Sequence, residues 1–377
     1  MLLLLEPMAL PMPSSAQRVA GKTSSDGVQR TALLPPGPGN PRNSEGDFVR
    51  LKSGRILFVY SRFTGGRGDD DAACLASRYS DDGGRSWSGK DEIVVSAGRP
   101  NGPLNNIMSV SLRRLPGGDI GLFYLRKNSD SDCRPLLRRS KDEGTTWAEP
   151  VECITDEVAY YVMNNDRVVI LPSGRILLPV ALHKGRNGRF ISRGRAMCYL
   201  SDDGGRSWQR SRTVLELTDR PKDGTGLQEP GVVQLRDGRL MMLCRTDIGF
   251  QYVSYSWDRG NTWSPAVPTS IRSPRSPASF ERIPRTGDLL LVWNDNPGPG
   301  QARTPLTTAI SRNDGRTWER RRVLEGDPTG TYCYTAISFV NGRVLLAYCC
   351  TGGLETTQVT SFPLAWLYGD DSAAKQP

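Results

Sequence analysis

Histidine is almost missing from this sequence, since His183 is the only one in 377 residues. A Ser-His-Asp triad needs a histidine base, and zinc sites draw heavily on histidine ligands, so both kinds of centre are nearly excluded. The eight cysteines include no Cys-x-x-Cys pair, which is neither a zinc pattern nor a disulfide framework. Most of them lie in apolar, strand-like segments and are expected to be buried. We therefore predict no metal and no cofactor.

Long hydrophobic runs are also missing. The N-terminal stretch MLLLLEPMALPMP lacks the basic residues that open a signal peptide and is interrupted by Glu6 and by prolines. It is also far too short to span a bilayer. We predict no membrane span, and both a cytoplasmic and an exported location stay open.

Basic residues exceed acidic ones, but they form no long run. The formal net charge of +9 favours attraction to anions, such as an acidic small substrate, although dispersed charge of this kind also serves solubility alone. Because the charge is not clustered, we predict no nucleic-acid partner. The oligomeric state stays open.

Glycine and proline are plentiful instead, with 40 and 27 residues, while aromatic residues make up only 8%. This composition is typical of many short strands joined by tight turns, so we predict an all-β fold. Residues 1–40, rich in Pro, Ser and Gly, are predicted to form a flexible arm, and residues 371–377 a disordered tail.

One short motif occurs five times. The stretch YSDDGGRSW at 79–87 returns as LSDDGGRSW at 200–208, and holding only Ser, Asp, Gly and Trp constant gives five matches, the last with Asn in the Asp place. Their tryptophans are spaced 60, 61, 55 and 55 residues apart: Trp87, Trp147, Trp208, Trp263 and Trp318. The motif suits a hairpin connection, because Asp accepts backbone N–H bonds, Gly supplies a positive φ and Trp anchors the turn on a sheet. It is therefore predicted to be structural, not catalytic.

A second repeat alternates with the first. Six segments read as an apolar run, a glycine turn and another apolar run, which predicts six β-hairpins with turn glycines Gly54, Gly118, Gly174, Gly238, Gly287 and Gly342. Together the two repeats predict a six-bladed β-propeller of four-stranded antiparallel sheets over residues 41–370. The last unit lacks one strand, and we predict that a strand from residues 15–35 supplies it and closes the ring.

The repeated motif resembles the Asp boxes of the sialidase (neuraminidase) superfamily, over about residues 42–368. The resemblance implies a six-bladed propeller and a retaining exo-glycosidase acting on a terminal acidic sugar. Such an enzyme needs arginines to hold the sugar carboxylate, because guanidinium planes match that group bidentately. It also needs an acid for the leaving oxygen, and in sialidases the nucleophile is a tyrosine assisted by a carboxylate.

Matching positions suggest the catalytic residues. Tyr334 begins the last inner strand, where the family keeps its nucleophile, although Tyr332 would point the same way in an extended segment. Glu229 matches the partner of that tyrosine. The acid/base matches Asp69, and a change in loop length would make it Asp70 or Asp71. Three adjacent carboxylates held close would raise one another's pKa and help to keep one protonated.

The arginines match the family less completely. Arg245 and Arg62 fall on family positions, and the third arginine is either Arg275 or Arg282. Sialidases open the first inner strand with Phe/Tyr-Arg-Ile-Pro, whereas this chain reads RNSEGDFVRL, which puts Ser44 or Glu45 in the arginine place and Arg42 slightly upstream.

Polar residues gather at equivalent strand starts, where they either pack by hydrogen bonding or bind sugar hydroxyls: Asn106, Ser109, Asn164, Asn165, Asp166 and Arg167. The favoured hypothesis is a sialidase-like glycosidase with a glycan or small acidic-sugar substrate. A glycosidase for a different sugar and a non-catalytic propeller that binds glycan or protein stay open as alternatives.

Overall fold

The computed structural model describes residues 18–96, 106–218, 224–296, 302–352 and 354–369. The predicted tail at 371–377 and the first 17 residues of the predicted arm lie outside these ranges. Within them the fold is all-β, as predicted, with a single short helix, α1 (Leu364–Tyr368). No helix among the described residues has the length and apolar character to cross a membrane.

Among the described residues, hydrogen bonding groups the strands into six sheets. A two-stranded ribbon contains β1 (Arg18–Ala20) and β7 (Ser86–Ser88). The largest sheet has eight strands: β4 (Arg42–Arg50), β5 (Ile56–Phe63), β6 (Ala73–Ser80), β8 (Glu92–Val95), β9 (Asn106–Arg114), β10 (Ile120–Ser129), β11 (Asp132–Ser140) and β12 (Val151–Glu152).

The remaining four sheets have four or five strands each. The next along the chain holds β13 (Tyr161–Val162), β14 (Val169–Ile170), β15 (Ile176–Leu182), β16 (Arg195–Ser201) and β17 (Gln209–Arg210). Two four-stranded sheets follow, with β18 (Gln228–Gln234), β19 (Leu240–Arg245), β20 (Phe250–Ser256), β21 (Val267–Arg272), and then β22 (Ser279–Arg282), β23 (Leu289–Asn294), β24 (Leu306–Ser311), β25 (Glu319–Glu325). The last sheet joins both ends of the chain through β2 (Lys22–Thr23), β3 (Gln29–Leu34), β26 (Cys333–Val340), β27 (Arg343–Cys350) and β28 (Thr356–Pro363).

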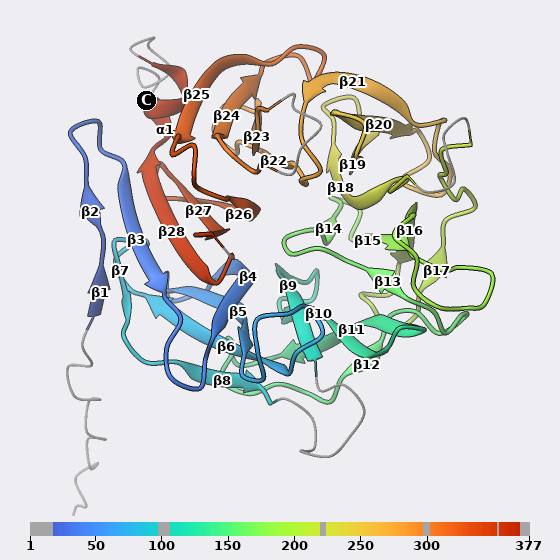
Figure 1. Cartoon of the computed structure of the whole chain (residues 1–377), viewed down its shortest axis with the longest axis horizontal. Coiled ribbons are helices and arrows are strands. Elements are labelled where there is room, and N and C mark those ends of the chain that lie inside the picture. The colour runs from blue at the N-terminus through green and yellow to red at the C-terminus, as the bar shows by residue number, and fades with distance from the viewer. Residues whose placement is uncertain (1–17, 97–105, 219–223, 297–301, 353, 370–377) are drawn as a thin grey trace, which may run out of the picture.

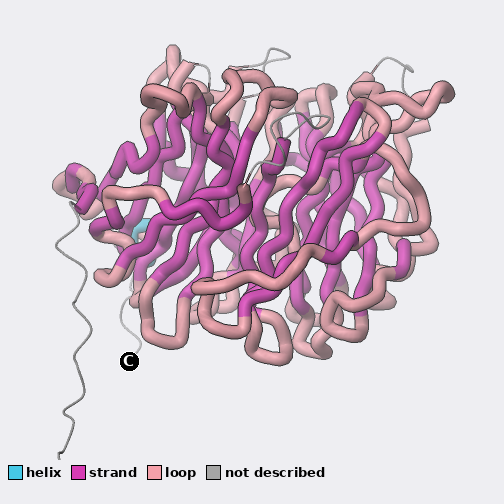
Figure 2. The backbone as a smooth tube through the Cα atoms, turned by 90° about the horizontal axis from the view of Figure 1, so that it is seen from below, coloured by secondary structure: helices cyan, strands magenta, loops and turns pink. Residues whose placement is uncertain are grey.

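The sheets stand around a common centre in a propeller-like arrangement, with β4, β9, β14, β18, β22 and β26 nearest to it (Figure 1). Figure 2 shows the same strands from the side, with loops at both ends. The prediction of six separate blades is wrong, because the part of the chain that the structure describes holds only four separate sheets of four or five strands. The first two predicted units are merged into the eight-stranded sheet by a parallel bridge between Ala73 of β6 and Asn106 of β9.

The repeated motif forms the turns that its residues predict. In the first copy, the Ser80 hydroxyl oxygen accepts from the Gly84 amide at 2.8 Å, and Asp82 Oδ1 accepts from the amides of Arg85 and Ser86. Gly84 has a φ of 89°, and an added Cβ would lie 2.8 Å from Leu345 Cδ1, so the turn packs closely against β27. In the last copy Asn313 Oδ1 accepts from the Thr317 amide at 2.9 Å, which shows why asparagine can replace the aspartate.

A strand near the N-terminus, β3, pairs with the strand nearest the C-terminus, β28. β3 lies antiparallel to β28, with Leu34 opposite Thr357 and Thr31 opposite Val359. Leu34 is buried in a cluster that also holds Phe58 of the eight-stranded sheet. That this pairing closes the ring stays a prediction.

Ring closure by β3 can be tested through its side chains. Leu34→Ala removes buried methyl groups from a cluster shared by two sheets, so we expect a loss of about 2–4 kcal/mol in the free energy of unfolding, measured in urea. Ala32→Ser, on an exposed position of the same strand, is the matched control and should stay within about 0.5 kcal/mol. Equal, small effects of both substitutions would mean that β3 is a dispensable edge.

All eight cysteines are buried and free, which agrees with their predicted role as small apolar residues. Burial raises the pKa of these thiols; for Cys244 the value is about 12. They are therefore protonated at neutral pH and poor nucleophiles.

Candidate active site

Four of the strands nearest the centre carry a β-bulge at the same place. The register shifts in β4 between Asn43 and Gly46, in β9 opposite Phe123 and Leu125, in β18 between Gln228 and Gly231, and in β26 between Cys333 and Ala336. A bulge adds one residue to the strand and redirects its side chain.

Three bulge residues also have a left-handed backbone. Ser109, Glu229 and Tyr334 have φ values of 62°, 46° and 59°. This conformation is unfavourable for residues other than glycine, and it persists only where surrounding structure holds it. All three side chains line one cavity of about 200 Å³, so the strained positions mark a candidate site.

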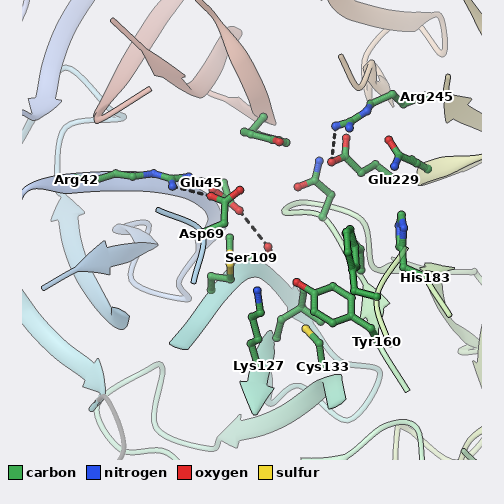
Figure 3. A pocket seen from close by; sticks show the side chains of 17 residues that line it. Arg42, Glu45, Asp69, Ser109, Lys127, Cys133, Tyr160, His183, Glu229 and Arg245 are labelled. Atoms are coloured by element: carbon green, nitrogen blue, oxygen red, sulfur yellow. Dashed lines mark hydrogen bonds and ion pairs between the residues drawn. The ribbon is translucent and has the colours of Figure 1, made fainter. Parts of the chain in front are cut away.

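The cavity brings together most of the predicted catalytic residues. Tyr334, Glu229 and Asp69 line it, together with Arg42, Glu45 and Arg245. Figure 3 shows the labelled charged residues of this group converging from β4, β18, β19 and the loop after β5, while Tyr334 lies in β26. Asp70 and Asp71 are not among the lining residues. Among the described residues, no three His, Cys, Asp or Glu side chains are grouped to hold a metal ion.

Glu229 and Arg245 form the most buried ion pair of the site. Arg245 Nη1 lies 2.6 Å from Glu229 Oε1, and both side chains are 10% exposed. Among the described residues, Glu229 Oε2 and Arg245 Nε have no hydrogen-bond partner. Buried polar atoms of this kind are costly unless a ligand satisfies them, so the pair is suited to bind a polar group.

Tyr334 is held as a neutral phenol. Burial raises its pKa well above the usual value, and the negative charge of Glu229 raises it further. Arg303 lies over the Tyr334 ring, 5.3 Å from its centroid, and donates to Cys333 Sγ at 2.9 Å. A neutral phenol needs a base before it can act as a nucleophile.

Arg303 is a site residue that was not predicted from the sequence. It shares a second cavity, of about 400 Å³, with Tyr334, Arg42 and Asp69, so the two cavities adjoin. Its position shortly before the apolar strand β24 is the one signal for it in the sequence, whereas Arg245 was predicted from its place directly after an apolar strand.

Arg42, the first residue of β4, contacts the loop that carries Asp69, Asp70 and Asp71. Its Nη1 lies 2.6 Å from Asp69 Oδ1, and its Nη2 donates to the Ser44 hydroxyl at 3.0 Å. The Arg42 side chain is 7% exposed, whereas that of Asp69 is 71% exposed. In β4, where the sequence has Ser44 or Glu45 in place of the arginine of sialidases, Arg42 is therefore the arginine that reaches the cavity.

The other acidic residues of this loop have different partners. Asp70 pairs with the buried Lys127 of β10, and Asp71 Oδ2 accepts from the Gly68 amide at 2.6 Å. Asn106 Nδ2 donates to the backbone oxygens of Asp69 and Asp71, at 3.0 and 2.7 Å. Asn106 thus pins the loop, and of the three acids only Asp69 is presented to the cavity.

Glu45 is a buried carboxylate in the same cavity. Its Oε1 accepts from the Ser109 hydroxyl at 3.0 Å, and Ser44 donates to Oε2. These two hydroxyl donors satisfy the charge locally.

Comparison with protein families decides the relationship. Residues 54–346, more than half of the chain, match the model described as a BNR repeat-like domain. The chain belongs to the BNR repeat-like family.

Solved structures agree with this assignment in fold. A protein of unknown function from Dyadobacter fermentans is 19% identical, with a TM-score of 0.69, over 88% of this chain and 97% of that protein. Trypanosoma rangeli sialidase is 16% identical, with a TM-score of 0.69, over 95% of this chain and 61% of the enzyme. The NanB sialidase from Streptococcus pneumoniae is 14% identical, with a TM-score of 0.68, over 95% and 72%.

These similarities show that this BNR repeat-like protein shares its fold with sialidases, which agrees with the predicted resemblance. The chain spans less than two thirds of the length of the trypanosomal enzyme. At identities below 20%, similarity to a sialidase structure shows a shared fold and does not establish a shared activity.

Three predicted arginines of this BNR repeat-like protein are not brought to the cavity. Arg62 pairs with Asp91 at 3.3 Å, and Arg282 donates to Asp314 at 3.0 Å. Arg275 offers its backbone oxygen to the guanidinium of Arg303. The structure places Arg42 and Arg303 beside Tyr334 instead.

Two predicted sugar-binding residues contact backbone rather than the cavity. Asn165 Nδ2 donates to the backbone oxygens of Gly46 and Tyr334, both at 3.0 Å, and Asp166 Oδ2 accepts from the Ile337 amide at 2.8 Å. They therefore tie β26, with its strained Tyr334, to the centre of the ring. Arg167 is likewise buried and donates to a backbone oxygen.

A buried charge cluster lies at the other end of the same strands. Arg113, near the end of β9, donates to Asp47 Oδ2 at 2.7 Å and to Asp166 Oδ1 at 2.6 Å. Arg113 and Glu281 line a cavity of about 570 Å³ there. Burial, followed by the charge of Asp166, raises the pKa of Glu281 to about 7.

Glu281 makes stability depend on pH. An acid whose pKa is raised on folding stabilises the protein fully below its ordinary value of 4.5 and loses that contribution as the pH rises through about 7. Glu281→Gln removes this dependence. We therefore expect the thermal midpoint of the variant, relative to the unmodified protein, to rise by about 3 °C between pH 4.5 and pH 7.5. A midpoint difference that is constant across this range would contradict the assignment.

Proposed function

We propose that this protein is a sialidase-like exo-glycosidase that removes a terminal acidic sugar from a glycan with retention of configuration. The observation that carries the proposal is the meeting of Glu229, Arg245, Tyr334 and Arg42, from distant parts of the chain, at one cavity. This chemistry requires a phenol nucleophile, a base close to the phenol, and guanidinium groups close to both.

In this proposal the sugar carboxylate is held by Arg42, Arg245 and Arg303, in place of the arginine set expected from the sequence alone. Arg245 Nε has no partner among the described residues and is free to donate. Arg42 and Arg303 share the adjoining cavity with Tyr334, so a carboxylate lying between the two cavities would be within reach of all three.

The first step forms a bond between the Tyr334 phenol oxygen and the anomeric carbon while the bond to the leaving oxygen breaks. Glu229 accepts the phenol proton, and Asp69 donates a proton to the leaving oxygen. In the second step Asp69 takes a proton from water, which attacks the anomeric carbon, and the Tyr334 oxygen leaves and recovers its proton. Two inversions give net retention.

Asp69 pairs with Arg42 at 2.6 Å, so it is not free to donate to the leaving oxygen while that contact holds. A substrate carboxylate that occupies the Arg42 guanidinium displaces Asp69. Binding of an acidic sugar would therefore release the acid for catalysis.

A second candidate is a glycosidase for a different sugar. Glu45 supports it, because a buried carboxylate in the cavity repels an anionic substrate and accepts hydrogen bonds from hydroxyl groups. A neutral, hydroxyl-rich sugar would be favoured by this residue.

An assay with aryl glycosides separates the candidates. The proposed enzyme should release the aryl group from an aryl α-sialoside, and proton NMR of the first product should show the retained anomer. Release only from neutral aryl glycosides would support the second candidate. Glycan binding without release from either class would favour a non-catalytic propeller.

A further inference from the structure

Two buried amide side chains line the cavity with one polar atom each left unpaired. Gln228 is 6% exposed and Asn164 is 3% exposed, and both are lining residues. Among the described residues, Gln228 Oε1 and Asn164 Nδ2 have no hydrogen-bond partner. A buried amide atom without a partner costs about 1–3 kcal/mol, so each of these atoms is suited to a ligand.

The orientation of Gln228 follows from its other contact. Its Nε2 donates to the backbone oxygen of Ser192 at 2.6 Å. Because a carbonyl oxygen accepts only from a donor, the amide nitrogen must face Ser192, which leaves Oε1 as an acceptor directed elsewhere. Gly194 lies alongside, where an added Cβ would come within 3.2 Å of Gln228 Cγ and 3.1 Å of His183 Cε1.

The side of Gln228 that faces Gly194 is lined by a neutral histidine and aromatic rings. Burial lowers the pKa of His183 to about 4, so this residue is neutral, and its Nδ1 bonds to the Ile191 backbone oxygen at 3.0 Å. Phe190 stacks on the His183 ring at 5.2 Å and contacts Tyr160 at 4.8 Å. This flank therefore differs from the one that holds Arg42 and Asp69.

We propose that Gln228 and Asn164 bind an uncharged, hydroxyl-bearing part of the sugar, with Gln228 Oε1 accepting from a hydroxyl and Asn164 Nδ2 donating to a hydroxyl oxygen. The inference rests on the proposed glycosidase function and adds which part of the substrate is selected. Hydroxyl groups fit because each one both donates and accepts, whereas an anionic group offers no donor to Gln228. Acylation of the bound hydroxyl removes that donor, so acylated substrates should be poor.

The test compares an aryl sialoside with analogues that each lack one hydroxyl. In the unmodified protein, one analogue should show a KM about 10- to 100-fold above that of the parent. Gln228→Met should raise the KM of the parent by a similar factor and reduce the ratio between the two substrates to near one. Because Gln228 takes no part in bond making, kcat should stay within about threefold and the pH profile should be unchanged.

Gln234→Met, at the other end of the same strand β18, is the matched control and should keep the full discrimination. If Gln228→Met does not fold, Asn164→Asp removes the proposed donor Nδ2 and should lower discrimination in the same way. Retained discrimination in a folded Gln228 or Asn164 variant would overturn the inference.

Failure of the proposed function gives a different result, because no sialoside would then be turned over by the unmodified protein. In that case the same comparison is made by calorimetry with free sialic acid and its deoxy analogues. Loss of discrimination in the binding constants of Gln228→Met would still support the inference, and unchanged constants, or no binding to the unmodified protein, would overturn it.

Discussion

Turnover of an aryl sialoside is expected to fall about 10⁴-fold or more when Tyr334 is replaced by Phe. The substitution removes the oxygen that bonds to the anomeric carbon but keeps the ring, so the shape of the cavity is preserved. The kcat of Tyr334→Phe is the measurement, and binding of a sialic-acid inhibitor, followed by calorimetry, should change by less than about threefold.

Tyr332→Phe is the matched control for this prediction. Tyr332 is 9% exposed and packs edge-on against Tyr348, with ring centroids 6.2 Å apart, and it does not line the cavity. Its loss of a hydroxyl should change kcat by less than about twofold. An inactive Tyr332→Phe beside an active Tyr334→Phe would reverse the assignment of the nucleophile.

Arg245→Met is expected to have the second-largest effect, on both activity and stability. Removing one partner of a buried ion pair leaves the other charge uncompensated, which costs about 3–5 kcal/mol. Glu229, whose side chain is 10% exposed, would be left in this state. The KM for the sialoside should also rise at least about 100-fold, because a charge-assisted bond to the carboxylate is lost. Chemical unfolding and steady-state kinetics measure the two effects.

The double variant Glu229→Met/Arg245→Met separates stability from function. With both charges gone, most of the lost stability should return, whereas activity should stay absent because the base is missing. Arg239→Met, immediately before the same strand β19, is the control. Arg239 pairs with an exposed Asp237, so its loss should cost less than about 1 kcal/mol. An equal loss in the free energy of unfolding for Arg245→Met and Arg239→Met would show that the buried pair stabilises the protein no more than an exposed one.

Part of the site could be predicted because position along a repeat is a reliable guide to position in a propeller. Glu229 and Tyr334 each stand at the start of a strand nearest the centre, and both line the cavity. Arg245 follows from the same logic at the end of β19. The choice of Asp69 over Asp70 and Asp71 needed the contacts in the structure, because Asp70 pairs with Lys127 and Asp71 accepts from the loop backbone.

The rest could not be predicted because side-chain direction depends on neighbouring strands. Arg62 and Arg282 occupy plausible positions in the sequence, yet each finds an acidic partner elsewhere. Arg303 reaches Tyr334 from the segment before β24, a contact that only packing between sheets creates. The left-handed backbone at Glu229 and Tyr334 likewise depends on bulges set by strand pairing.

The amino-acid sequence by itself determined the repeated turns and the all-β character of this protein. Each turn is built from hydrogen bonds between residues only a few positions apart, as from Gly84 to Ser80, so local chemistry is sufficient. The tertiary structure alone decided the merging of the first two predicted units and the identity of the charges that meet at the cavity. Those features depend on contacts between residues far apart in the chain, such as the bond from Asn165 to Tyr334, and these contacts exist only once the sheets have packed around their common centre.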